Sequence, residues 1–150
     1  MEVTHTIRIS DSDPAEELRR QGQLRVEIKG RSMEPLLKSG RNTVHLRCLR
    51  DAPKPLDVVL FCREDGSFVL HRVLACGRDG FTICGDHQTE PERGIQRRQI
   101  VGRMEGYYAG NRYHSCRGVG YRLYARIWSG SLPLRKLWAA LRRRAREAST

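Results

Sequence analysis

Short runs of apolar residues alternating with polar ones fill the middle of the chain. The runs LRVEIKG, TVHLRCLR, DVVLFCRE, SFVLHRVLAC, FTICGD and QIVGRMEGYY are rich in Val, Ile, Leu, Phe and Tyr. Turn signals such as Asp65-Gly66 and Asp79-Gly80 separate neighbouring runs, and Asp-Gly between apolar runs favours a hairpin. The pattern predicts an all-β core, a small and mostly antiparallel sheet of about six strands that is coiled or closed into a barrel.

Helical signals are confined to the two ends of the chain. The segment DPAEELRRQ predicts a short helix, because Asp13 can cap its N-terminus and Pro14 suits its first position. Near the C-terminus, YRLYARIW and LRKLWAALRR have helical period on either side of SGSLP. We therefore predict an N-terminal helix and extension, a β-domain and a helical tail. Their predicted ranges are 1–22, 23–110 and 111–150.

The formal net charge of +11 is concentrated in the tail. Residues 111–150 hold ten basic residues and one acidic residue, Glu147, so the rest of the chain is nearly neutral. Leu134, Leu137 and Trp138 share one face of the second helical piece, among arginines. This tail is interpreted either as a helix that packs on the β-domain or as an interfacial helix on an anionic membrane surface. Nucleic acid is the least favoured partner, because a basic body is missing.

The cysteines and the apolar runs restrict the compartment. The five cysteines form no CxxC pair, so the sequence predicts no metal site, implies no other cofactor, and favours buried free thiols in a reducing compartment. No apolar run has the roughly 18 residues that a membrane-crossing helix needs. The first residues also lack the pattern of a signal peptide. We expect a cytoplasmic protein, with the tail resting on the inner membrane face as one arrangement.

A serine lies on an irregular corner in the stretch GRSMEP. Pro35 lacks a backbone donor and disfavours helix at Glu34, so Ser32 is held just after a predicted strand. Such a serine is either a turn former or a nucleophile, and a nucleophilic serine needs a base. Lys29 and Lys38 lie too near Ser32 in the sequence to face it readily, Lys54 lies in a loop between two prolines, and Lys136 lies in the tail, so a buried lysine on a neighbouring strand is missing. A histidine is therefore the expected base.

His71 and Asp86 are the candidate partners of the serine. Alternation along SFVLHRVL places Val69, His71 and Val73 on one face of a strand, so the imidazole is expected to be at least half buried. It is then either a core histidine bonded to a backbone carbonyl or a general base. Asp86 follows the FTIC run, either as a turn former or as a carboxylate hydrogen-bonded to His71. The neighbouring His87 is expected to be exposed.

Taken in order, Ser-Met-Glu-Pro, His-Arg-Val and Gly-Asp resemble the motifs of type I signal peptidases, in the endoplasmic-reticulum-like variant that uses histidine in place of lysine. The resemblance covers roughly residues 24–106. It implies the coiled all-β sheet shared with LexA-type self-cleaving repressors. It also implies that Ser32 is the nucleophile, His71 the general base and Asp86 the supporting acid. For substrate and oxyanion binding it implies Gly30, Arg31, Met33 and Pro35, together with the backbone N–H of the serine.

The expected function is a serine endopeptidase that cleaves an extended peptide or leader segment, bound as an added strand. A short polar helix stands where the family usually has a membrane anchor, and His87 stands where it usually has Asn. These departures favour an intracellular maturation peptidase, for instance one that trims the leader of a ribosomally made peptide. A non-catalytic peptide- or membrane-binding β-module is the alternative. A LexA-like self-cleaving regulator is disfavoured, because too few residues precede the first strand for a DNA-binding domain.

Overall fold

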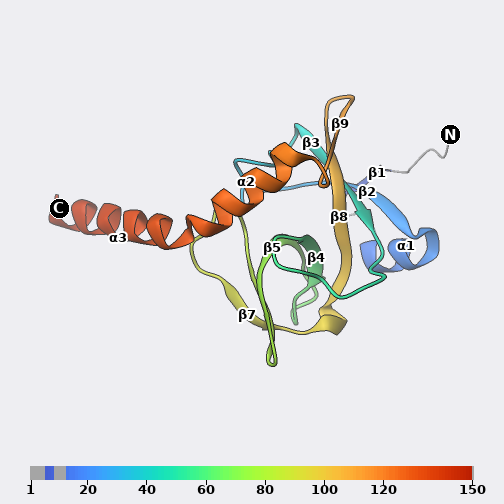
Figure 1. The fold of residues 1–150 in the computed structure, drawn as a ribbon, viewed down its shortest axis with the longest axis horizontal. Coiled ribbons are helices and arrows are strands. Elements are labelled where there is room, and N and C mark those ends of the chain that lie inside the picture. The colour runs from blue at the N-terminus through green and yellow to red at the C-terminus, as the bar shows by residue number, and fades with distance from the viewer. Residues whose placement is uncertain (1–5, 9–12, 150) are drawn as a thin grey trace.

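The structure is a computed structural model that describes residues 6–8 and 13–149. The remaining residues of the predicted N-terminal extension, 1–5 and 9–12, lie outside the described residues. All six predicted strands are present within a single sheet (Figure 1). The strands are β1 (Thr6–Arg8), β2 (Gln23–Glu27), β3 (Asn42–Arg47), β4 (Val58–Cys62), β5 (Phe68–Gly77), β6 (Gly80–Cys84), β7 (Glu92–Ile95), β8 (Ile100–Ala109) and β9 (Arg112–Ser115).

The sheet is open, so the predicted all-β core is confirmed but the barrel alternative is wrong for the described strands. The strand order is β1-β2-β3-β8-β4-β5-β6-β7, with β9 pairing to β8, and β1 and β7 form the two edges. All described pairs are antiparallel except β1 with β2. The long strand β8 pairs with β3 along most of its length and with β4 near its start, so it joins the two halves of the sheet.

Two apolar clusters form the core, one on each face of β4. Val58 and Leu60 face the first cluster, and Val59 and Phe61 face the second. A strand that is buried on both faces has apolar residues at consecutive positions, which explains the run VVLF in β4. In β5 the same alternation continues, with Val73 in the second cluster.

Three described strands were not predicted from the sequence. The strands β7 (ERGI) and β9 (RYHS) contain few apolar residues, and β1 is short. Each of the three pairs with a longer strand, namely β2, β6 or β8. Their strand conformation therefore depends on this pairing rather than on a local apolar pattern. Because β9 pairs with β8, the sheet continues past residue 110 into the segment assigned to the tail.

The predicted N-terminal helix is confirmed as α1 (Pro14–Gln21). The Asp13 carboxylate accepts hydrogen bonds from the N–H groups of Ala15, at 2.9 Å, and Glu16, at 3.3 Å. The helix ends at Gly22, which has φ 78°, a conformation that glycine adopts without strain. Leu18 is fully buried in the first apolar cluster, so α1 is part of the core.

The tail forms α2 (Val119–Gly130) and α3 (Leu132–Ala148), separated by Ser131. Ala125 of α2 is buried, and Tyr121 packs against the first cluster. By contrast, α3 runs away from the sheet and ends far from it (Figure 1). Among the described helices, none offers an apolar stretch of the length required to cross a bilayer. The short 3₁₀-helix η1 (Arg97–Gln99) precedes β8.

All five cysteines are free thiols, but their burial differs from the expectation. Cys84 is buried, whereas Cys76 is exposed at the end of β5. The other three are partly exposed. Cys76 lies where β5 extends beyond the core, which explains why its apolar run did not imply burial.

Candidate active site

Ser32 and His71 line the same pocket, although 39 positions in the sequence separate them. The pocket has a volume of about 520 Å³. One wall is the segment that follows β2, and the opposite wall is the start of β5 with the turn before it. Gln88 contributes from the loop between β6 and β7. The tertiary structure therefore brings together the two residues that the sequence proposed as nucleophile and base.

A tight turn presents Ser32 to the pocket. Gly30 has φ 77° and turns the chain after β2, and the N–H of Leu37 donates to the carbonyl of Met33 at 2.9 Å. Met33 and Leu37 are both buried, so they anchor the turn in the first apolar cluster. The Glu34–Pro35 peptide bond is cis.

The four residues proposed for substrate and oxyanion binding separate into two groups. Gly30 and Met33 line the pocket with Ser32. Arg31 is exposed and pairs with Glu34 at 3.2 Å, and Pro35 is exposed, so neither lines the pocket. Within the described part of the chain, no hydrogen bond from the backbone N–H of Ser32 is found.

His71 lies in the middle of β5, paired with Val59 of β4, and is 1% exposed. Its ring is 6.0 Å from that of Phe61, centroid to centroid. Nδ1 has no hydrogen-bond partner among the described residues, so the bond to a backbone carbonyl expected of a core histidine is missing there. Burial disfavours the imidazolium and lowers the pKa of His71 from 6.5 to about 4. The ring is therefore neutral at pH 7 and can accept a proton.

The loop that follows β6 lies against both Ser32 and His71. A Cβ atom built on Gly85 would lie 2.5 Å from the carbonyl oxygen of Ser32 and 3.0 Å from Nε2 of His71. The N–H of His87 donates to that same serine carbonyl at 2.9 Å, while its side chain is exposed as predicted. No hydrogen bond joins the Ser32 and His71 side chains in the described structure. In substrate-free enzymes such bonds are often long and tighten only in the complex.

Gly85→Ala is expected to slow the reaction of Ser32 with an acylating probe. The added methyl cannot avoid the serine carbonyl at 2.5 Å, so the Ser32 turn or the imidazole must move. A displacement of about 1 Å costs on the order of 10²-fold in rate. The measurement is the rate at which an acylating probe modifies Ser32. Gly77→Ala is the matched control, because its Cβ would meet only the Gly80 carbonyl oxygen, at 3.7 Å. Equal rates for the two variants would contradict this geometry.

Asp86 lies close to the site, but its carboxylate is engaged with Arg72. Arg72 donates from Nε to Oδ1 at 2.8 Å and from Nη2 to Oδ2 at 2.9 Å, and the Tyr124 hydroxyl also donates to Oδ2 at 2.8 Å. Arg72 and Asp86 are only 1% and 2% exposed. The hydrogen bond to His71 expected of Asp86 is not among the described contacts, and its charge raises the pKa of His71 less than that of Glu92 does.

The carboxylate that faces His71 belongs to Glu92, a residue that the sequence did not single out. Its Oε1 lies 3.9 Å from Nδ1 of His71, and the negative charge raises the pKa of the imidazole against the larger effect of burial. Arg63 holds this carboxylate through a two-point contact, with Nε to Oε2 at 3.2 Å. Glu92 is the first residue of β7, a strand that the sequence did not predict. No local pattern therefore indicated that its side chain lies near His71.

Among the described residues, no group of three or more His, Cys, Asp or Glu side chains is placed to hold a metal ion. Comparison of the sequence with protein-family models and with curated proteins finds no match. The chemistry of the pocket therefore has to be argued from its own residues.

Proposed function

We propose that this protein is a serine endopeptidase of the signal-peptidase-like type, with Ser32 as nucleophile and His71 as general base. The observation that carries the proposal is that a corner serine and a buried, neutral histidine line one open pocket. A serine hydroxyl is a weak nucleophile at neutral pH, and an adjacent neutral imidazole is the group that activates it.

In the proposed reaction, Nε2 of His71 accepts the proton of Ser32 Oγ as Oγ bonds to the scissile carbonyl carbon. The carbonyl electron pair moves to its oxygen, which the backbone N–H of Ser32 holds. The imidazolium then donates its proton to the amine nitrogen as the C–N bond breaks. A water molecule repeats the sequence on the acyl-enzyme, which releases the carboxylic acid and restores the serine.

Glu92 is the proposed orienting group for His71. A carboxylate near Nδ1 favours the tautomer that carries its proton there, leaves Nε2 free as an acceptor, and stabilises the imidazolium that forms. The 3.9 Å separation from Nδ1 supports this assignment. Asp86 acts on the site indirectly in this proposal, because its pair with Arg72 fixes the loop that begins at Gly85.

An extended peptide is the substrate that the pocket suits. Residues 68–71 of β5 pair with β4, whereas the described pairing of β5 with β6 begins only at Arg72. One edge of 68–71 therefore carries unpaired backbone groups along the pocket, and an extended chain can add to such an edge as a strand. Ile28, Met33 and Phe68 supply an apolar lining for its side chains.

Labelling with a fluorophosphonate probe tests the proposed function without a known substrate, since the probe phosphorylates an activated serine. We expect one adduct, located on Ser32 by peptide mass spectrometry. Ser32→Ala is expected to remove the adduct with little change in melting temperature, because Ser32 is a surface-turn residue. Ser115→Ala, on β9 away from the pocket, is expected to label like the native protein. No adduct on the folded native protein would favour the non-catalytic β-module, and an adduct that survives in Ser32→Ala would exclude Ser32.

A further inference from the structure

The large exposed apolar side chains of the described chain are concentrated on the two C-terminal helices. All of them except Tyr113 lie on α2 or α3, and they are between 49% and 82% exposed. The set is Val119, Leu123, Ile127, Leu134, Leu137, Trp138 and Leu141. We call these seven side chains the apolar stripe. A group this large, gathered on one structural element, indicates an interaction surface rather than scattered surface residues.

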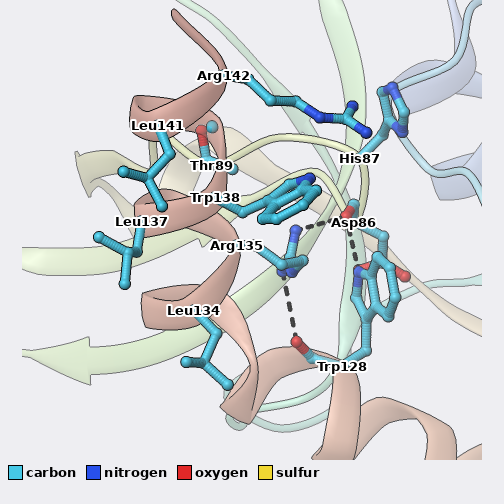
Figure 2. Close-up of a pocket in the computed structure, with 11 residues that line it drawn as sticks. Asp86, His87, Thr89, Trp128, Leu134, Arg135, Leu137, Trp138, Leu141 and Arg142 are labelled. Carbon is cyan, nitrogen blue, oxygen red and sulfur yellow. Dashed lines mark hydrogen bonds between the residues drawn. The ribbon is translucent and has the colours of Figure 1, made fainter. Parts of the chain in front are cut away.

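The apolar stripe follows helical spacing. Its α2 part faces away from the protein body, whereas its α3 part lines an open groove that Asp86, His87 and Thr89 border on the side of the body, as Figure 2 shows. On α2 its members are four residues apart, while Tyr124, Ala125 and Trp128 occupy the opposite side of the helix towards the body. On α3 the spacing is three and four residues, which keeps its members on one side of the helix. Figure 1 shows α3 following α2 end to end and extending into open space beyond the sheet.

Basic residues border the apolar stripe along its whole length. The two helices carry eight basic residues and one acidic residue, Glu147 near the C-terminus. Arg122 and Arg126 alternate with the exposed apolar residues of α2. On α3 the guanidinium of Arg142 lies 5.2 Å from the ring centroid of Trp138, so a cation is placed beside the largest apolar group.

We propose that α2 and α3 lie in the plane of an anionic lipid bilayer, with the apolar stripe inserted among the acyl chains and the arginines on the lipid phosphates. Amphipathic helices that lie in the interface carry Trp and Leu on one face and Lys or Arg on the other. This composition is found in α3, and α2 adds three aliphatic residues with Arg122 and Arg126 between them. The excess of positive charge selects acidic headgroups, with each basic residue adding to the attraction.

Other occupants fit the apolar stripe less well. A second copy of the chain would bring two strongly basic helices together, and like charges repel at short range. Arginines could bind the phosphates of RNA, but proteins that bind single-stranded RNA also stack its bases on several aromatic rings. Trp138 is the one aromatic residue in the apolar stripe. An anionic bilayer accommodates both parts of this surface, the aliphatic side chains among the acyl chains and the arginines at the phosphates.

The same helices hold the loop that borders the candidate active site. Trp128 Nε1 and Arg135 Nη1 both donate to the carbonyl of Asp86, at 2.7 and 2.9 Å, as Figure 2 shows. Arg135 also donates to the carbonyl of Gln88 at 3.1 Å, and Gln88 lines the pocket of Ser32. Docking of the helices would therefore hold that pocket in a fixed position relative to the membrane surface.

Co-sedimentation of the full-length protein with lipid vesicles tests the proposal. We expect binding to phosphatidylcholine vesicles that contain phosphatidylglycerol, weak binding to phosphatidylcholine alone, and a further decrease as salt is raised. The double variant Leu137→Gln, Leu141→Gln should weaken binding by about tenfold or more, because two apolar side chains no longer enter the bilayer. The control Ala140→Gln introduces the same uncharged side chain on α3 at a position outside the apolar stripe and the groove that it lines, and it should bind like the native protein.

Two further measurements separate the occupants and separate this proposal from the enzymatic one. The Trp fluorescence should shift to shorter wavelength on anionic vesicles, and Trp138→Phe should remove the shift. Ser32→Ala should bind vesicles like the native protein, so loss of peptidase activity leaves the result intact. The membrane proposal is overturned by equal binding to both vesicle types, by binding to RNA but not to vesicles, or by a native dimer that Leu137→Gln dissociates.

Discussion

Replacing His71 by alanine is expected to slow the acylation of Ser32 by about 10²–10⁴-fold, the usual contribution of a positioned general base. The imidazole lies next to the serine turn across Gly85. Lys29 is the one lysine among the residues described as lining the pocket, and it lies on the wall of Ser32, only three positions before it in the chain. The measurement is the rate of fluorophosphonate labelling, with circular dichroism to verify that the variant is folded. A loss of less than about tenfold in a folded variant would show that His71 is not the base.

The pH dependence of the same rate gives a second measurement on His71. Only the neutral imidazole accepts a proton, so labelling should fall as pH drops through about 4 and stay level from pH 6 to pH 8. On the sequence alone the fall would be expected near the ordinary pKa of about 6.5, and burial of the ring moves it down. His71→Ala should lose this pH dependence. A native midpoint near 6.5 would mean that the reacting imidazole is solvated.

The same pKa shift predicts how stability changes with pH. The unfolded chain binds a proton at His71 near pH 6.5, whereas the folded chain does so only near pH 4. Protonation therefore favours the unfolded state between these values. The stability linked to His71 is complete above about pH 6.5 and is lost as pH falls towards 4.

Replacing Asp86 by alanine is expected to lower the free energy of unfolding by about 3–5 kcal/mol, because it leaves the guanidinium of Arg72 buried without its counter-ion. Burial alone lowers the pKa of Arg72, but the hydrogen bond and charge of Asp86 outweigh burial and raise it, so this arginine stays charged. The measurement is urea unfolding at neutral pH. The double variant Arg72→Met, Asp86→Leu should recover part of the loss, because it removes both charges.

Glu92→Gln is the contrasting control for Asp86. Glu92 is about one third exposed, so its loss should cost less than about 1 kcal/mol of stability. It should nevertheless slow labelling of Ser32, because Glu92 faces Nδ1 of His71. If Asp86→Asn lowered the labelling rate without changing stability, Asp86 rather than Glu92 would be the acid that supports the base.

Local pattern was sufficient for much of the fold. Six strands, the Asp13-capped helix and the two helices of the tail follow from residue period and turn chemistry, which act over a few neighbouring residues. The burial of His71 also follows, since alternation places it between Val69 and Val73 on the same face of β5. Local pattern did not decide whether the sheet is open or closed, because closure depends on pairing between edge strands that are distant in the sequence.

Residue pattern alone singled out three candidates for the site: a serine on a corner, a histidine within an apolar strand, and Asp86 directly after the FTIC run. Glu92 was not among them. Tertiary packing selected the carboxylate partners of Arg72 and His71. Asp86 is turned to Arg72, and Glu92 reaches His71 through β7, a strand that forms by pairing with β6. The alternation of side chains along a strand determines the face on which each side chain lies. The course of a loop depends instead on packing between residues that are distant in the sequence, and local pattern does not predict it.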